Sequence, residues 1–399
     1  MQGFPRQDGR KGIRNRVVVA YLVECAHHVA REIAMPLRET YDGEVHLIGF
    51  PGCYPNDYAS RIMRQLCTHP NVGAVLLVSL GCESFDRVGL AEVIEASGRP
   101  VATLVIQQSG GTAKTIAAGR AWVEATCRQL EATPRVEMTV DELVVGTICG
   151  GSDATSGLTA NPATGRAFDL LIERGATAIF EETGELIGCE HLMAKRAATE
   201  ALGREIIASV EKAERYYRTL GHASFAPGNA DGGLTTIEEK SLGAYCKSGQ
   251  SSISGLIKPG DVPPHGGLYL LDVVPDGEVR FGFPNIVDNA EIVELIACGS
   301  HIILFTTGRG SVSGSAISPV LKICANPDTY RALADDMDID AGRILQQRGT
   351  LDEVGREIFD LVQETAAGKL TKSERLGHRE FILTYKSFDP IGPNCLPGA

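Results

Sequence analysis

The sequence contains no apolar run that approaches the roughly 18 residues needed to span a membrane. Residues 1–15, MQGFPRQDGRKGIRN, are charged and glycine-rich and lack the apolar centre of an export signal. Basic side chains are in deficit, with 38 Lys and Arg against 50 Asp and Glu, and the formal net charge is -12. Because nucleic acids and anionic membranes attract basic faces, neither is expected as the main partner. We therefore expect a cytoplasmic protein.

Several motifs of metal and nucleotide sites are also absent. No CxxC pair occurs among the 11 Cys, which excludes a zinc ribbon and a thioredoxin-like site. The 9 His show neither HxH nor HExxH spacing, which leaves only the isolated His191 and His265 as candidates. No GxGxxG occurs, so a nicotinamide site has little support. Scattered Cys in a chain without an export signal are expected to be reduced thiols.

The pattern that is present predicts an α/β fold. The 399 residues suggest two or three domains, and 43% hydrophobic residues suffice for a full core. Apolar, β-branched runs alternate with longer segments of helical spacing, which predicts crossover units and a parallel sheet. We expect a doubly wound parallel sheet in an N-terminal domain over residues 1–148, followed by a second α/β domain over residues 149–399. The strands predicted for the first sheet cover residues 16–23, 45–50, 72–80, 101–106 and 143–148.

Residues 145–165, VGTICGGSDATSGLTANPATG, are the strongest candidate for a functional loop. Two glycines after a strand let the backbone turn sharply and approach a ligand closely. The small polar residues that follow are good helix caps, and the free N–H groups at a helix start attract anions. The alternative is a strand-to-helix turn with a half-buried Cys, since buried free Cys is common.

Three thiols share one setting, because Cys53, Cys82 and Cys149 each follow a predicted strand and lie beside glycine. The carboxyl ends of parallel strands meet at one edge, where open α/β sheets bind ligands. We therefore expect the three thiols on one edge of one sheet. They could hold zinc, or three corners of a [4Fe–4S] cluster, with one position left open for substrate. The alternative is that three strand-end Cys arise by chance among 11.

Other candidate residues lie in the later glycine-rich loops. Arg309 stands between Gly308 and Gly310 after a predicted strand, where a guanidinium and exposed N–H groups could bind a carboxylate. The alternative is a surface Arg in a turn. Small polar residues of similar loops complete the predicted substrate contacts, namely Ser152, Asn161 and Thr236.

Three residues are candidates for acid–base work. Lys240 follows paired carboxylates and could be a tuned base or a carboxylate ligand, or a solvated charge at a helix start. Glu182 ends a predicted strand and could orient a base or bind substrate hydroxyls, or act as a cap. Asp153 could take part in proton transfer or cap the following helix.

Five motifs together resemble the altronate/galactarate dehydratase family, and the resemblance runs from about residue 3 to about residue 385. The motifs are GRKGIRN at 9–15, GCE at 81–83, CGGSDATSGLTANPATG at 149–165, GGLTTIEEKSLG at 232–243 and LFTTGRGSVSGSAISPVLK at 304–322.

The resemblance implies a hydro-lyase that removes water from an aldonate or aldarate to give a 2-keto-3-deoxy acid, with iron (Fe2+ or a [4Fe–4S] cluster) or another divalent metal as cofactor. In such a reaction a base takes the proton α to the carboxylate while metal or acid helps the β-hydroxyl to leave. The family pattern has a His shortly before the Cys53 position and an acidic residue just before the Cys149 position. Here these places are occupied by residues 49–51, GFP, and by Ile148, which leaves the substrate open.

Three hypotheses follow. The first is a sugar-acid dehydratase of altronate-like substrates, and its variant is the large subunit of a lyase for another hydroxy acid, such as a sulfonated one. That variant would need a separate small subunit, because many family members carry a small N-terminal domain that this sequence does not show. The second is a nucleotide-binding oxidoreductase that uses residues 110–112, GGT, as a phosphate turn. The third is a subunit that is inactive alone. We also expect a homo-oligomer.

Overall fold

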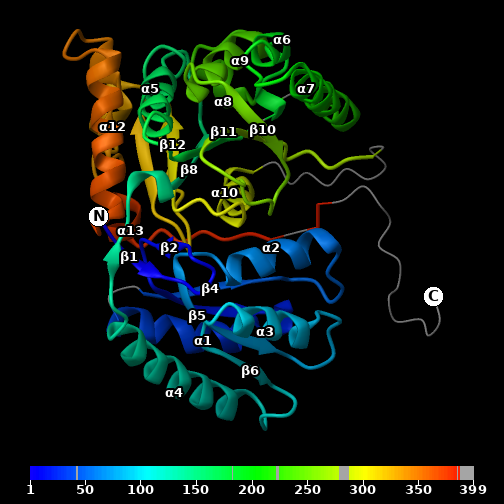
Figure 1. Ribbon diagram of the computed structural model, residues 1–399. Helices are drawn as coiled ribbons and strands as arrows, with labels where there is room; N and C mark the ends of the chain where they lie inside the picture. The colour runs from blue at the N-terminus through cyan, green and yellow to red at the C-terminus, as the bar shows by residue number, and fades with distance from the viewer. Residues whose placement is uncertain (42–43, 182, 222–223, 278–286, 384, 387–399) are drawn as a thin grey trace.

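The computed structural model describes residues 1–41, 44–181, 183–221, 224–277, 287–383 and 385–386. Two parallel sheets, each covered by helices, form two lobes that lie one above the other in Figure 1. We call the lower one the first lobe, residues 16–131, and the upper one the second lobe, residues 144–376. The predicted α/β class with parallel sheets is confirmed.

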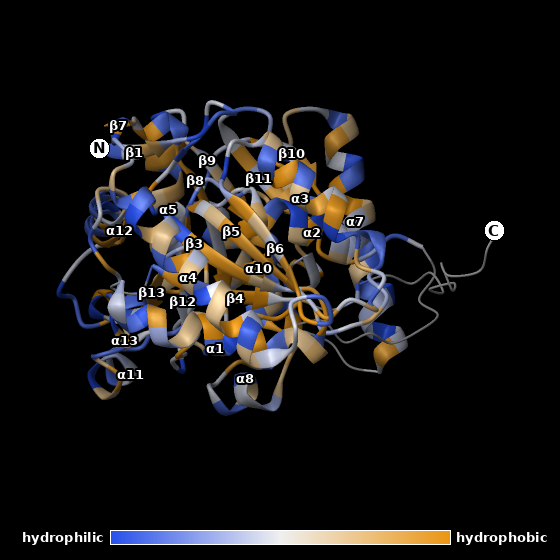
Figure 2. Cartoon of the chain, turned by 90° about the horizontal axis from the view of Figure 1, so that it is seen from below, coloured by the Kyte–Doolittle hydropathy of each residue, from blue (hydrophilic) through white to orange (hydrophobic). Residues whose placement is uncertain are grey.

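The first lobe has a four-stranded parallel sheet in the order β4-β3-β5-β6. Its central strand β5 is buried at all 8 positions, as expected for an apolar run covered on both faces. Side chains of alternate parity in β3 and β5 pack against α1 and α4 on one face and α2 on the other. Figure 2 shows these apolar strands at the centre of the view from below. The elements are β3 (Arg16–Tyr21), α1 (Glu24–Thr40), β4 (Val45–Gly49), α2 (Asp57–Cys67), β5 (Val72–Ser79), α3 (Arg87–Ala96), β6 (Val101–Val105) and α4 (Thr112–Glu131).

The second lobe has a seven-stranded sheet in the order β10-β11-β9-β8-β12-β13-β14, and every neighbouring pair is parallel. The chain moves from β8 toward β9 and β11, and then returns to the other side of β8 with β12. The crevice at the carboxyl ends of β8 and β12 is therefore a topological switch point, where such sheets bind ligands. The strands are β8 (Val144–Cys149), β9 (Thr177–Phe180), β10 (Ile253–Ile257), β11 (Gly267–Leu271), β12 (Ile302–Thr307), β13 (Val320–Cys324) and β14 (Ile339–Asp340).

Helices cover both faces of this sheet and its carboxyl edge. Apolar side chains of α5 and α12 pack on one face, whereas α10 packs on the other. Local capping sets where several helices begin: Thr199, for example, accepts a hydrogen bond from the amide of Leu202 at the start of α7. Residues 188–220 are therefore divided between two helices. The helices are α5 (Ala160–Ile172), α6 (Glu190–Ala194), α7 (Glu200–Leu220), α8 (Pro227–Asp231), α9 (Ile237–Tyr245), α10 (Asp288–Ala297), α11 (Pro327–Ala332), α12 (Leu351–Ala366) and α13 (Lys372–Leu376).

Short elements complete the described chain. A small antiparallel sheet in the order β2-β1-β7 joins the start of the chain to the segment between the lobes. None of the helices seen in the described ranges is long and apolar enough to cross a membrane. The short elements are β1 (Gln2–Pro5), β2 (Lys11–Gly12), β7 (Val136–Glu137) and the 3-10 helices η1 (Val140–Glu142), η2 (Thr183–Glu185), η3 (Cys246–Ser248) and η4 (Gly342–Ile344).

One predicted strand belongs to the other sheet. Residues 143–148 were expected to end the first sheet, but β8 pairs with β9 and β12 at the centre of the second sheet. The strand itself is correctly predicted, because an apolar run buried on both faces looks the same in either sheet. Its partners depend on long-range packing that the run does not encode.

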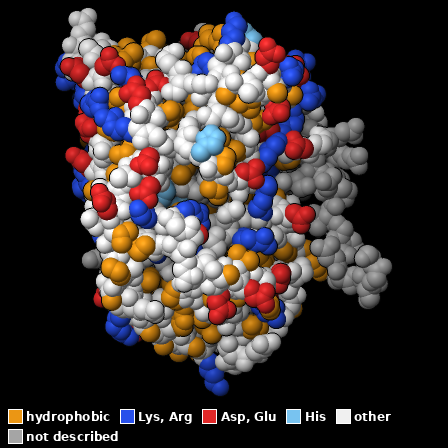
Figure 3. Space-filling view, viewed as in Figure 1, with side chains coloured by type: hydrophobic (Ala, Val, Ile, Leu, Met, Phe, Trp, Pro, Cys, Tyr) orange, Lys and Arg blue, Asp and Glu red, His pale blue; other side chains and the backbone are white. Residues whose placement is uncertain are grey.

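The two lobes share a buried apolar interface. Ile62 and Met63 of α2 belong to the same buried cluster as Ile292 and Ile296 of α10. On the face seen in Figure 3, acidic and basic side chains are interspersed over both lobes. Apolar packing between α2 and α10 therefore forms part of the contact between the lobes.

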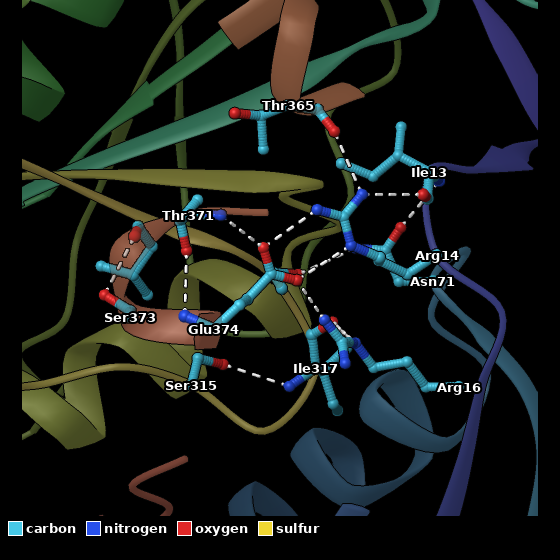
Figure 4. A network of polar contacts seen from close by, with 12 residues as sticks. Ile13, Arg14, Arg16, Asn71, Ser315, Ile317, Thr365, Thr371, Ser373 and Glu374 are labelled. Atoms are coloured by element: carbon cyan, nitrogen blue, oxygen red, sulfur yellow. Dashed lines mark hydrogen bonds and ion pairs between the residues drawn. The ribbon is translucent and has the colours of Figure 1, made fainter. Parts of the chain in front are cut away.

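A buried ion network also ties the start of the chain to its end. Glu374 of α13 accepts hydrogen bonds from Arg14 at 2.9 and 3.0 Å and from Arg16 at 2.5 Å. Figure 4 shows the carboxylate between the two guanidinium groups. The second Arg of the basic segment GRKGIRN is thus neutralised by the protein's own Glu374.

Candidate functional site

A cavity of about 720 Å³ opens at the carboxyl edge of the second sheet. Its walls come from the loops after β8, β9 and β12, from residues 224–229, from α9 and from the first turns of α10. This is the edge at which parallel α/β sheets bind ligands, and it includes the switch point between β8 and β12.

The loops after β8 and β12 hold each other in place at the switch point. The amide of Gly150 donates to the carbonyl of Thr306 at 3.1 Å, and the amide of Arg309 donates to the carbonyl of Gly151 at 2.8 Å. A Cβ on Gly150 would lie 2.1 Å from a carboxylate oxygen of Asp288. Only glycine therefore allows the β8 loop to approach the start of α10 so closely.

Three side chains form the polar centre of the cavity wall. The ammonium of Lys240 lies 2.5 Å from Glu185 Oε1, and the thiol of Cys149 donates to Glu185 Oε2 at 3.0 Å. Lys240 also donates to the carbonyl of Ser224 at 2.7 Å, and Cys149 Sγ lies 3.2 Å from the hydroxyl of Ser152. Cys149 and Lys240 are buried, so the three groups are largely desolvated.

The environment fixes the protonation of two of these groups. Burial and the neighbouring Glu185 carboxylate raise the pKa of the Cys149 thiol to about 11. Burial alone would lower the pKa of Lys240, but Glu185 and Cys149 outweigh it and leave this pKa above its ordinary value. At neutral pH the wall therefore presents a thiol and an ammonium ion rather than a thiolate and a free amine.

A second group of carboxyls faces the same cavity. Burial and Glu185 raise the pKa of Asp288 to about 6. Burial raises the pKa of Glu291 to about 8, against the opposing effect of Lys386. Burial, with Glu291 nearby, also raises the pKa of Glu181 well above its ordinary value. Carboxyl groups shifted toward neutral pH in a cleft are typical of acid–base sites.

The structure brings several predicted residues together at this cavity. Its lining includes the predicted residues Cys149, Ser152, Lys240, Arg309 and Gly310. Arg309 is exposed at the rim and donates to the carbonyl of Gly228 at 3.1 Å, so its other guanidinium donors can reach a ligand. The predicted residue Glu182 lies outside the described residues.

Other predicted residues have structural contacts instead. The carboxylate of Asp153 accepts hydrogen bonds from Thr155 and from Asn326, so it shapes the turn after β8 and does not face the cavity. Gly308 allows the close approach of that carboxylate, since a Cβ there would lie 2.2 Å from it. Both residues were predicted because they lie in the loops that form the cavity, but neither is among the residues that line it.

Asn161 and Thr236 are likewise not among the lining residues. Buried Asn161 joins three elements, because it accepts from Thr306 at 2.8 Å and donates to the carbonyl of Gly243 at 3.0 Å. Exposed Thr236 caps α9 by accepting from the amide of Glu239 at 3.2 Å. The cap starts the helix that carries Lys240 into the cavity, which is an indirect contribution to the site.

The three predicted metal ligands do not share one sheet edge. Cys53 and Cys82 are exposed and follow β4 and β5 of the first sheet, whereas Cys149 is buried and ends β8 of the second. The prediction of a single edge is therefore wrong, because it depended on β8 being in the first sheet. Within the described ranges, no three His, Cys, Asp or Glu side chains are grouped so that they could hold a metal ion. The three thiols as placed do not fit a shared iron centre.

Several lining residues were missed from the sequence. Asp288 and Glu291 are spaced at i and i+3, which places two acids on one side of α10 and could have drawn attention to it. Glu185 lies in η2, just beyond the strand end that was considered. Nothing local marks Lys386, which reaches the cavity from the C-terminal segment.

Comparisons with known proteins agree with this architecture. Residues 3–131 match the model for the D-galactarate dehydratase/Altronate hydrolase second domain, and residues 140–388 match the D-galactarate/Altronate dehydratase C-terminal model. The chain is 34% identical to the (2R)-sulfolactate sulfo-lyase subunit beta of Chromohalobacter salexigens, over 96% of both chains. It is 30% identical to the altronate dehydratases of Bacillus subtilis and Escherichia coli, over 96% of this chain and 77% of each relative. The chain therefore belongs to the altronate/galactarate dehydratase family.

Proposed function

We propose that this protein is a hydro-lyase that removes water from a sugar acid, an altronate-like aldonate or an aldarate, to give a 2-keto-3-deoxy acid. The observation that supports this most is the pairing, in one cavity, of a desolvated ammonium at Lys240 with carboxyls at Asp288 and Glu291 whose pKa values lie near neutrality. Removal of a proton α to a carboxylate requires both a base and a cation that stabilises the resulting enolate.

The substrate carboxylate has a binding place at the rim. Arg309 offers guanidinium donors there, and the backbone turns of Gly151 and Gly310 have positive φ values of 63° and 93°. The amide of Gly310 already donates to the hydroxyl of Thr307 at 2.9 Å, so the guanidinium of Arg309 is the donor assigned to the substrate carboxylate. Lys240 lies deeper, where its charge can stabilise the enolate oxygens as they form.

Asp288 is the base in this proposal. Its carboxyl lines the cavity beside Gly150 and, with a pKa of about 6, is mostly ionised at neutral pH. It would accept the α-proton of the substrate, while Lys240, the base candidate from sequence, remains protonated and acts as the nearby cation.

The test is formation of 2-keto acids from a panel of aldonates and aldarates. Asp288→Asn should lower kcat/KM by about 10²–10⁴-fold, the usual range for a general base. The wild-type kcat/KM should fall as the pH drops through about 6, because protonated Asp288 can no longer accept a proton. Asp352→Asn is the matched control, since Asp352 also lies in the first turn of a helix but is exposed. Full activity in Asp288→Asn would refute the assignment.

A second candidate is elimination from a sulfonated hydroxy acid. It is favoured by the alignment with the (2R)-sulfolactate sulfo-lyase subunit beta, which covers 96% of both chains. The same α-proton would be removed, and the group that leaves the β-carbon would be sulfite instead of hydroxide. Release of sulfite from (2R)-sulfolactate tests it. We propose a separate small subunit for this case, and activity of the isolated chain would refute that need.

Iron stays a separate proposal. The thiols of Cys53, Cys82 and Cys149 as placed do not form one ligand set, so no step above is assigned to a metal. Metal and sulfide analysis of the purified protein would decide whether a centre is present.

A further inference from the structure

Glu181 is a buried carboxyl group of the cavity wall that has no hydrogen-bond partner in the part of the chain that the structure describes. It follows β9 directly, lines the cavity and is 2% exposed. Neither of its oxygens has a hydrogen-bonding partner among the described residues. A buried carboxylate in this state would lack both solvation and compensation, so the neutral acid is the stable form.

The charged groups around Glu181 act in both directions, because two carboxyl groups favour the neutral acid and two cations oppose it. Glu291 and Glu294 of α10 face it, and both are buried. The nearest ammonium in the C-terminal segment, Lys386, donates to both oxygens of Glu294 at 2.8 and 2.9 Å and is therefore already engaged by another carboxylate. Lys247, after α9, is the other cation that acts on Glu181.

The remaining titratable groups near the cavity form two separate sets. Tyr58 of α2 donates to Glu294 at 2.7 Å, so Glu294 is held by both Tyr58 and Lys386. Lys240 and Glu185 lie in the other part of the wall, with Asp288 beside them. One part of the wall thus holds an ion pair with an adjacent base, and the other holds neutral carboxyl groups.

We propose that Glu181 is the general acid that protonates the departing β-hydroxyl. This inference rests on the proposed dehydratase function. As the C–O bond at the β-carbon breaks, its electron pair stays on oxygen, and the proton of Glu181 completes a water molecule. Glu181 is left as a carboxylate, and Asp288 holds the proton taken from the α-carbon. The enol product gains a proton at the β-carbon as its enol proton is released, and proton transfer from Asp288 to Glu181 through solvent restores both groups.

The identity of the leaving group decides whether a general acid is needed. Hydroxide is a poor leaving group and departs readily only when protonated, whereas sulfite leaves as a stable anion. A neutral carboxyl without hydrogen-bond partners is therefore useful for dehydration and dispensable for loss of sulfite. A general acid at Glu181 therefore favours a polyhydroxylated acid as the substrate of this cavity.

The test compares wild type with Glu181→Gln, which keeps the shape but cannot transfer a proton. The 2-keto acid should form about 10²–10⁴-fold more slowly, the range for loss of a general acid. Exchange of the substrate's α-hydrogen with D2O should persist, since that step belongs to Asp288. The fall in wild-type rate at high pH, where Glu181 ionises, should be absent from the variant. Glu181→Asp should recover part of the rate. Equal product formation by wild type and Glu181→Gln would overturn the proposal.

A second measurement does not depend on substrate. The infrared difference spectrum between wild type and Glu181→Gln at neutral pH should show the C=O band of a neutral carboxylic acid. Glu238→Gln on α9 is the matched control, because the side chain of Glu238 is exposed and its replacement should leave that band unchanged. Absence of the band in the Glu181 difference spectrum would overturn the neutral acid. A wild type that shows the band but neither exchanges nor dehydrates any sugar acid would instead refute the proposed function.

Discussion

Replacement of Glu374 by Gln should weaken the link between the two ends of the chain. Glu374 is the shared acceptor of Arg14 and Arg16, and its side chain is 11% exposed against 5% for each Arg. Gln can still accept one hydrogen bond, but it cannot neutralise two buried guanidinium groups. The variant therefore leaves uncompensated positive charge between α13 and the start of β3.

The size of the effect follows from the shift in pKa. Burial alone would raise the pKa of Glu374, but Arg14 and Arg16 lower it from 4.5 to about 2. Each pKa unit corresponds to about 1.4 kcal/mol, so the ionised carboxylate contributes about 3 kcal/mol to the free energy of unfolding. That value agrees with the ~3–5 kcal/mol typical of breaking one partner of a buried pair.

The pH dependence has a definite sign. Because the pKa is lower in the folded state, the contribution is complete above the unfolded pKa of 4.5 and is lost as the pH falls toward about 2. Urea unfolding of wild type and Glu374→Gln should therefore differ by about 3 kcal/mol at pH 7, with the difference shrinking below pH 4.5.

A matched control is available on the neighbouring helix α12. Glu364 pairs with Lys369 at 2.7 Å, but the two side chains are 56% and 47% exposed. Glu364→Gln should cost less than about 1 kcal/mol, as surface pairs do. If the urea midpoint of Glu374→Gln equals that of Glu364→Gln at pH 7, the reasoning from burial and shared charge is refuted.

Three further predictions concern the site. Gly150→Ala should slow 2-keto acid formation about 100-fold, because its Cβ would lie 2.1 Å from Asp288, and wild-type rates would contradict that close approach. Iron and acid-labile sulfide should be measured after anaerobic purification. About four of each per chain, lost in Cys82→Ser, would support a cluster. An iron content that is unchanged in both Cys82→Ser and Cys149→Ser would reject it. Arg309→Met should raise KM about tenfold or more with little change in kcat, and an unchanged KM would place the substrate carboxylate elsewhere.

Local sequence determined the elements and part of the site. The continuous apolar run of β5 predicts a strand buried on both faces, and it is one. The glycine-flanked loops around Cys149 and Arg309 were recognised because turns at strand ends have a characteristic residue composition that can be seen in the local sequence. The structure places both loops at the rim of one cavity, with hydrogen bonds between them.

Only the tertiary structure decided which elements meet. The run that forms β8 is compatible with either sheet. Its pairing with β12 brings together residues more than 150 positions apart and places β8 in the second sheet. Cys149 therefore lies in a different sheet from the strands that precede Cys53 and Cys82. Lys386 meets Glu294 across 92 residues, and the two oxygens of Glu181 are left without a hydrogen-bond partner among the described residues. Periodicity and turn chemistry act over a few residues, whereas burial, charge pairing and shifted pKa values arise from neighbours brought together by packing of the whole core.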